Sequence, residues 1–112
     1  MQNWMPQPGD NQLLRGKVEV KKAQIIAMTS YPAQMVLSLA GTLPTPCHQL
    51  RVQVASPDAQ NRILVDVYSL YQPSKICVQV LENFQANVPL QGLAAGKYTV
   101  WVNGSQIGEF SQ

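Results

Sequence analysis

Residues 93–110, LAAGKYTVWVNGSQIGEF, alternate apolar and polar side chains before an Asn-Gly dipeptide at positions 103 and 104. Tyr98, Val100 and Val102 fall at every second position, which is the pattern of a strand with one buried face. Asparagine and glycine both tolerate positive φ, so Asn-Gly between two strands predicts a hairpin turn. The tripeptide NGS also matches an N-glycosylation sequon, but the turn is our interpretation. The stretch therefore predicts two antiparallel strands in an all-β fold.

The register of this hairpin is a problem in itself. A regular two-residue turn would place Glu109 opposite Tyr98 and would bury an unpaired carboxylate, which is costly. We therefore expect either a three-residue loop, NGS, or a bulge at Gly108. Either arrangement brings Phe110 into the core beside Tyr98.

Trp101 lies on the opposite face of the same strand, with Lys97 and Thr99. We expect this indole to be partly exposed and covered by a neighbouring outward side chain or by the N-terminal segment that carries Trp4 and Pro6. If neither covers it, Trp101 is a candidate interaction residue, because tryptophan contributes strongly at interfaces.

The rest of the chain repeats the alternation of strands, and Pro, Gly, Asn or Asp bounds each segment. We predict strands over residues 17–28, 34–43, 48–55, 62–70, 84–90, 97–102 and 106–110. Pro89 lacks a backbone donor and predicts that its strand lies at a sheet edge or ends there. Residues 74–83, SKICVQVLEN, are compatible with a strand or a helical turn. The expected fold is an antiparallel two-sheet sandwich of about seven strands. The apolar positions expected to face its core are Met35, Leu37, Leu39, Leu50, Val52, Val54, Ile63, Val65, Val67, Phe84, Ala86, Val88 and Leu90.

Length and composition describe one small domain. The chain has 112 residues, so we expect residues 1–14 to be a flexible N-terminal tail and residues 15–112 to form a single sandwich. The basic cluster near its N-terminus, Arg15, Lys17, Lys21 and Lys22, is interrupted by Glu19 and lacks aromatic residues, so we expect no nucleic-acid partner.

No apolar run approaches the length needed to cross a bilayer, and residues 1–12 lack the features of a signal peptide. If the protein is exported, its targeting peptide lies upstream of residue 1, where a lipid anchor is also an open expectation. We expect no transmembrane segment.

Cys47 precedes one predicted strand and Cys77 follows the next. If these two strands form a hairpin, both thiols lie at the same end of the sheet, and we expect them to form a disulfide. Such a bond would place the protein in an oxidising, extracytoplasmic compartment. The alternative is two separate buried thiols in a cytosolic protein.

Catalytic and metal-binding patterns are scarce. His48 is the single histidine. A closed zinc site requires four Cys or His ligands, and the chain has only three such residues. The sequence contains no G-x-S-x-G elbow and no phosphate-binding glycine loop. We therefore expect no metal, no cofactor and no enzymatic activity. A small hydrolase centred on His48 is the weakest of three hypotheses.

The pattern L-x-x-G-x-Y-x-V-x-V is formed here by Leu93, Gly96, Tyr98, Val100 and Val102. It resembles the penultimate strand of immunoglobulin-like and fibronectin-type-III-like domains. The resemblance implies an immunoglobulin-like sandwich and a tyrosine corner, in which the ring of Tyr98 lies in the core and its hydroxyl bonds upstream backbone.

The leading functional hypothesis is a non-catalytic binding or structural module of a secreted or envelope-tethered bacterial protein, with an unidentified protein or envelope partner. The alternative is a protein-protease inhibitor that presents a loop at the end of the sandwich. The candidate loops are TSYPAQ, residues 29–34, and LYQPSK, residues 70–75, each of which combines a proline with a tyrosine, Tyr31 or Tyr71. The loop motifs of chagasin-like inhibitors are absent from the sequence.

Overall fold

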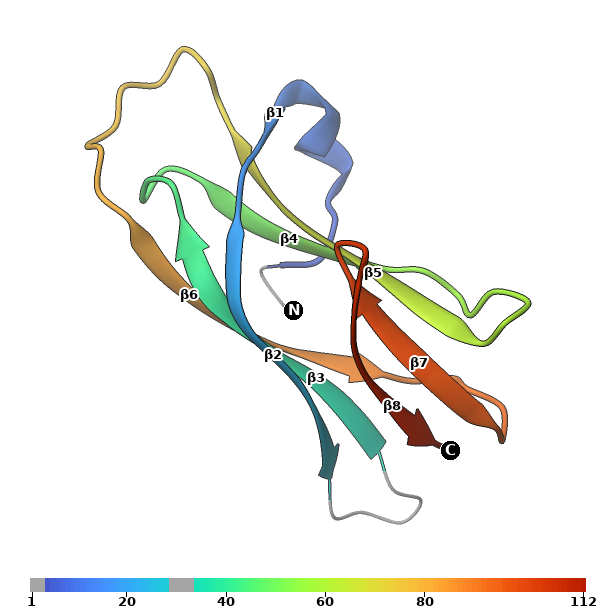
Figure 1. Cartoon of the computed structure of the whole chain (residues 1–112). Coiled ribbons are helices and arrows are strands. Elements are labelled where there is room, and N and C mark those ends of the chain that lie inside the picture. The colour runs from blue at the N-terminus through green and yellow to red at the C-terminus, as the bar shows by residue number, and fades with distance from the viewer. Residues whose placement is uncertain (1–3, 29–33) are drawn as a thin grey trace.

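The computed structural model describes residues 4–28 and 34–112. Over these residues it contains one 3-10 helix, no α-helix and eight strands in two sheets (Figure 1). The elements are η1 (Pro8–Gln12), β1 (Leu14–Gly16), β2 (Glu19–Met28), β3 (Gln34–Leu43), β4 (Gln49–Val54), β5 (Arg62–Tyr71), β6 (Glu82–Leu90), β7 (Lys97–Val102) and β8 (Ser105–Ser111). The predicted all-β two-sheet sandwich is confirmed.

The larger sheet is organised around β5. β4 pairs with residues 65–70 of β5 along one edge, while β1 and β7 pair with opposite ends of β5 along the other edge, and β8 continues beyond β7. The β5–β7 pair is parallel and every other pair is antiparallel. The smaller sheet has the order β2-β3-β6, so β6, which carries Pro89, lies at an edge as predicted.

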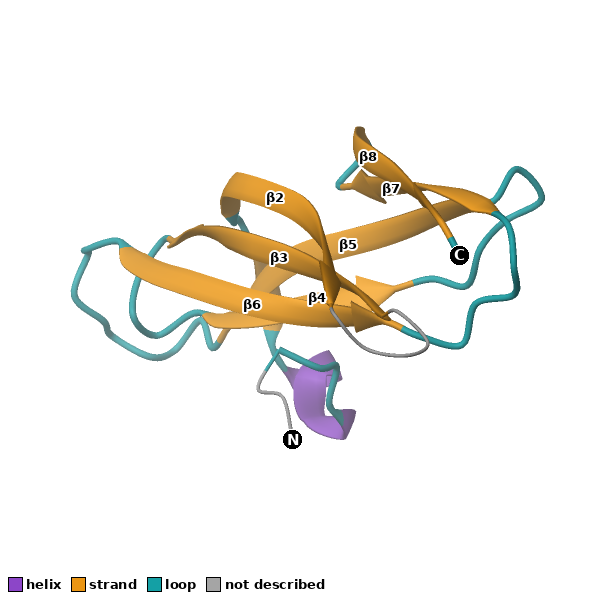
Figure 2. Cartoon of the chain, turned by 90° about the horizontal axis from the view of Figure 1, so that it is seen from below, coloured by secondary structure: helices purple, strands orange, loops and turns teal. Residues whose placement is uncertain are grey.

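The strand boundaries differ from the sequence prediction mainly near the N-terminus. The strand expected over residues 17–28 begins at Glu19, and the short β1 before it belongs to the other sheet. Residues 75–81 form neither a strand nor a helical turn. Figure 1 shows the β5–β6 connection projecting from one end of the sandwich, and Figure 2 shows the 3-10 helix lying outside the strands.

The core forms between the inward faces of the two sheets. In β5 the inward residues Ile63, Val65 and Val67 are at most 3% exposed, whereas Leu64 between them is 44% exposed, which establishes one buried face. Val54, at the end of β4, is 38% exposed, so its prediction as a core residue is wrong. The buried apolar cluster consists of Leu37, Leu39, Val52, Ile63, Val65, Val67, Ala86, Val88, Leu90, Tyr98, Val100, Val102 and Phe110.

The C-terminal hairpin uses a bulge rather than a longer loop. Val102 pairs with Ser105 across a two-residue turn, and the register shifts between Val100 and Trp101, so that Ile107 is the extra residue next to Gly108. Phe110 therefore lies opposite Tyr98, and their rings stack with centroids 5.6 Å apart. The bulge prediction is confirmed, and the three-residue loop is not what forms.

The N-terminal segment packs on the outer face and edge of β4. The backbone N–H of Val52 donates to the carbonyl of Trp4 at 2.9 Å, and Asp10 in η1 forms an ion pair with Arg51. Arg51 points outward, as alternation predicts, yet its side chain is only 3% exposed because this segment covers it. That residues 1–14 are flexible stays a prediction.

Candidate functional site

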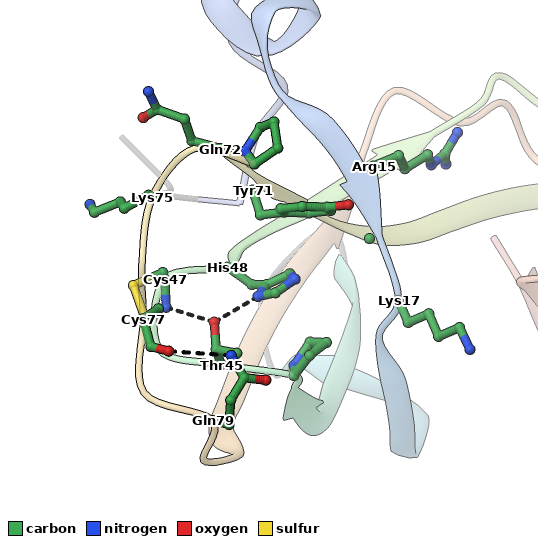
Figure 3. Close-up of a pocket in the computed structure, with 13 residues that line it drawn as sticks. Arg15, Lys17, Thr45, Cys47, His48, Tyr71, Gln72, Lys75, Cys77 and Gln79 are labelled. Atoms are coloured by element: carbon green, nitrogen blue, oxygen red, sulfur yellow. Dashed lines mark hydrogen bonds between the residues drawn. A yellow bond between two sulfur atoms is a disulfide. The ribbon is translucent and has the colours of Figure 1, made fainter.

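A disulfide joins Cys47, just before β4, to Cys77 in the β5–β6 connection, with their Cα atoms 6.2 Å apart (Figure 3). The β4–β5 hairpin brings the two cysteines to one end of the sheet, because Gln49 pairs with Leu70. The predicted disulfide is confirmed. It anchors an otherwise long connection to the sandwich at its midpoint.

A pocket of about 620 Å³ lies beside this disulfide. Its side chains include His48 and Tyr71, whose ring centroids are 5.0 Å apart, and Thr45, whose Oγ1 lies 2.8 Å from His48 Nδ1 (Figure 3). Thr45 Oγ1 also accepts a hydrogen bond from the backbone N–H of Cys47 at 3.2 Å. Gly16 permits this packing, because a Cβ at that position would lie 3.0 Å from the imidazole. Tyr71 thus contributes a ring to the pocket wall.

The chemistry of this pocket is that of a neutral, packed histidine. Burial lowers the pKa of His48, so its imidazole is uncharged at neutral pH. The hydroxyl of Thr45, which contacts the imidazole, belongs to a residue that is only 5% exposed. No acidic residue is among the residues that line the pocket. Within residues 4–28 and 34–112, no three His, Cys, Asp or Glu side chains gather as a set of metal ligands.

The most unusual surface follows the pocket along the chain. Residues 76–81, ICVQVL, which we call the apolar arm, contain four highly exposed apolar side chains. Ile76 is 98% exposed, Leu81 69%, Val78 65% and Val80 55%. Such a concentration of exposed apolar side chains is typical of an interaction site.

The backbone of the apolar arm is also unpaired. Among the described residues, no backbone–backbone hydrogen bond involves residues 76–81. One side-chain bond is made there, from Gln79 Nε2 to the carbonyl of Cys77 at 3.2 Å. The alternation of Ile76, Val78 and Val80 was visible in the sequence, but it did not reveal that these side chains would be left in solvent.

Tyr98 and Gly96 organise the strand that precedes the C-terminal hairpin. Tyr98 is 4% exposed and its hydroxyl donates to the carbonyl of Ala94 at 2.7 Å, the upstream backbone bond expected of a tyrosine corner. Gly96 has φ of 155° and exchanges two backbone hydrogen bonds with Gln112. Both residues therefore have structural roles at the end of the sandwich remote from the disulfide.

Trp101 lies on the outer face of the larger sheet and is half-buried. Its indole Nε1 donates to Thr99 Oγ1 at 3.0 Å, and Leu64 of β5 is its cross-strand neighbour. A hollow of about 400 Å³ lies beside it. Trp4 lies elsewhere, in a hollow that includes Phe84 of β6, so the described part of the N-terminal segment does not cover Trp101. Tyr31, the tyrosine of the other candidate loop, lies outside the described residues.

The disulfide, the two sheets and the buried Tyr98 define this chain as a small disulfide-bonded β-sandwich domain. No helix within the described residues is long and apolar enough to cross a bilayer.

Residues 37–112 match the ORF11 beta-sandwich domain, and the chain belongs to this family. The matched region runs from within β3 to the end of β8 and includes the disulfide and the apolar arm. Comparison with curated proteins and with solved structures gave no match in either case.

Proposed function

We propose that this protein is a non-catalytic binding module of a secreted or envelope-tethered protein, and that the apolar arm is its binding segment. The observation that supports this proposal is the exposure of Ile76, Val78, Val80 and Leu81 on one short segment. Full burial of an aliphatic side chain of this size is worth about 1.5–3 kcal/mol. Covering four partly exposed ones therefore offers on the order of 5 kcal/mol toward association.

The disulfide supports the proposal in two ways. Cys77 lies within the arm and is bonded to Cys47 at the start of β4, so the arm loses less conformational freedom when it binds. A disulfide is also typical of an oxidising compartment, which favours an extracytoplasmic location.

The test uses the protein in which Ile76 and Val80 are both replaced by serine. These side chains are 98% and 55% exposed, so the replacement should leave stability nearly unchanged. Labelled wild-type protein should bind saturably to the cell-envelope or secreted fraction of the organism that makes it, and the double variant should not. Leu64→Ser, a matched replacement of a 44% exposed residue on another face, is the control. Equal binding by all three proteins would remove the proposal.

Protease inhibition is the second candidate, and one observation favours it. Among the described large apolar residues, Ile76 is the most exposed, and it is followed directly by the disulfide-bonded Cys77. The backbone N–H and C=O groups of residues 76–81 are unpaired within the described chain, so they are available to a protease cleft that binds an extended segment. The candidate loop of residues 70–75 leads directly into this segment. Assays against a panel of serine and cysteine proteases test this candidate, and no inhibition at micromolar protein would exclude it.

We also propose that the sandwich is immunoglobulin-like. The hydrogen bond from Tyr98 to the Ala94 carbonyl supports this relation, whereas the parallel β5–β7 pair has to be accommodated as a variation. An experimental structure whose strand connections match no immunoglobulin-like topology would reject it.

A further inference from the structure

We propose that the apolar arm binds its partner by strand addition, taking an extended, acid-tipped segment of another protein as a new neighbouring strand. This inference rests on the proposed function and specifies the chemistry of the partner. It uses three features of the arm, namely its backbone, its side-chain alternation and the charges around it.

The backbone of the arm is available for pairing. Residues 76–81 make no backbone–backbone hydrogen bonds within the described chain, and they run directly into β6 at Glu82. β6 pairs with β3 on one side and is the edge of its sheet among the described strands. The arm therefore extends an open strand edge, the kind of edge to which extended peptides add.

The side chains of the arm suit a strand. Ile76, Val78 and Val80 are β-branched and stand at alternate positions, the residues and spacing that strands favour. An added strand would place its own apolar side chains against this row, and cross-strand apolar pairs stabilise such an edge.

The charges at the base of the arm indicate which partner is favoured. Lys75 directly precedes the arm. Lys17 lines the opposite side of the pocket beside the disulfide (Figure 3), and it also lies with Glu19 and Leu81 in a hollow at the other end of the arm. Neither lysine forms an ion pair within residues 4–28 and 34–112, while Arg15, which also lines the pocket, is neutralised by Asp66. A partner strand with an acidic residue at the Lys75 end would complement that lysine and gain association rate and specificity.

The same features argue against a bilayer as the occupant. Inserting the arm into lipid would remove water from a run of unpaired backbone N–H and C=O groups, which is strongly unfavourable for each group. A β-strand satisfies those groups as it covers the side chains.

The experiment selects partners from a displayed library of random decapeptides, with disulfide-intact wild-type protein as the target. The triple replacement of Ile76, Val78 and Val80 by serine serves for counter-selection. Enriched peptides should alternate apolar residues and carry Asp or Glu at one end. N-methylation of every second backbone nitrogen should raise Kd about tenfold or more in one of the two registers, because several hydrogen bonds are lost.

Two variants separate backbone from side-chain effects. V78P and Q79P each remove one backbone donor from the arm, and one of them should weaken peptide binding strongly, whereas V78T should not. K75E should weaken the binding of acid-tipped peptides and strengthen the binding of peptides that carry lysine at that end. Thermal unfolding of each variant verifies that it folds.

Several outcomes would overturn the proposal that the arm binds a segment of another protein by strand addition. These are equal Kd values after N-methylation in both registers, the absence of any peptide that depends on the arm, binding to anionic phospholipid vesicles that V78P leaves intact, and dimerisation that V78P abolishes. If saturable binding to the envelope fraction persists in such a case, the proposed function survives and only this inference fails. If that binding is also absent, both fail.

Discussion

Replacing Asp10 with Asn should destabilise the fold far more than its place in an N-terminal segment suggests. The guanidinium of Arg51 donates to both carboxylate oxygens of Asp10, at 3.0 and 3.2 Å. It also donates to the Leu50 carbonyl at 2.9 Å and to Gln49 Oε1 at 2.8 Å. The Arg51 side chain is 3% exposed and that of Asp10 is 18% exposed, so the guanidinium is removed from water while the carboxylate keeps some contact with it. Asparagine keeps the shape of aspartate but is uncharged. Its amide NH2 replaces one carboxylate oxygen, so an N–H donor of asparagine would face an N–H donor of Arg51.

The magnitude follows from this burial. Removing one partner of a buried ion pair typically costs about 3–5 kcal/mol, and the partly exposed carboxylate places this pair near the lower end, at about 3 kcal/mol. For a domain of this size that loss corresponds to a fall in Tm of roughly 10 °C. The D10N/R51M double variant should be more stable than D10N alone, because a buried cation is then replaced by an apolar chain.

Urea unfolding at pH 7 measures this loss, with E109Q as a matched carboxylate-to-amide control. Glu109 pairs with Lys97 at 3.6 Å, but both side chains are more than half exposed, so E109Q should cost about 0.5 kcal/mol or less. The hydrogen bonds from Arg51 hold the pKa of Asp10 below its usual 3.8. Because the pKa of Asp10 is lower in the folded chain than in the unfolded chain, the ionised carboxylate stabilises the fold at pH values above the unfolded-state pKa. This stabilisation is lost as the pH falls through the folded-state pKa. The gap between wild type and D10N should therefore narrow below about pH 4. A D10N loss equal to that of E109Q would refute the reasoning.

Three further predictions concern the fold itself. Tyr98→Phe removes one buried hydrogen bond and should lower the free energy of unfolding by about 1 kcal/mol or somewhat more, measured by urea unfolding. Asn103→Ala should lower the free energy of unfolding by about 2 kcal/mol, because the Asn103 side chain bonds both the N–H and the C=O of Val67. Asn103→Asp keeps the acceptor for the Val67 N–H, so it should lose only part of that free energy. Burial lowers the pKa of His48 in the folded chain below the usual histidine value of 6.5. As the pH falls below 6.5, the imidazole is therefore protonated in the unfolded chain before it is protonated in the folded chain. Stability should therefore decrease from pH 7 toward pH 5, and His48→Gln should flatten that dependence; an unchanged slope would contradict it.

Most of the fold could be predicted from the alternation of side chains along the strands and from the residues at the turns. The row Ile63, Val65 and Val67 predicted a buried face because side chains alternate strictly along a strand, and the cost of burying Glu109 predicted the bulge that places Phe110 beside Tyr98. β1 is three residues long and has no alternation to detect, so its pairing with β5 could be seen only in three dimensions. The parallel β5–β7 pair is likewise a matter of chain topology, on which periodicity is silent.

The candidate site was less predictable, and the reason is physical. A strand pattern indicates which side chains share a face, but whether that face is covered depends on what the rest of the chain brings to it. In β4 this made Arg51, which lies on the face opposite Val52, one of the most buried side chains, because η1 supplies a carboxylate that covers it. In the apolar arm the reverse occurred, since no other described segment pairs with residues 76–81, and the side chain with the strongest reason for burial, Ile76, is 98% exposed. A buried cation is costly unless a partner neutralises it, as Asp10 does for Arg51. By the same reasoning, we propose that the apolar arm, which no other described segment covers, is covered by a partner.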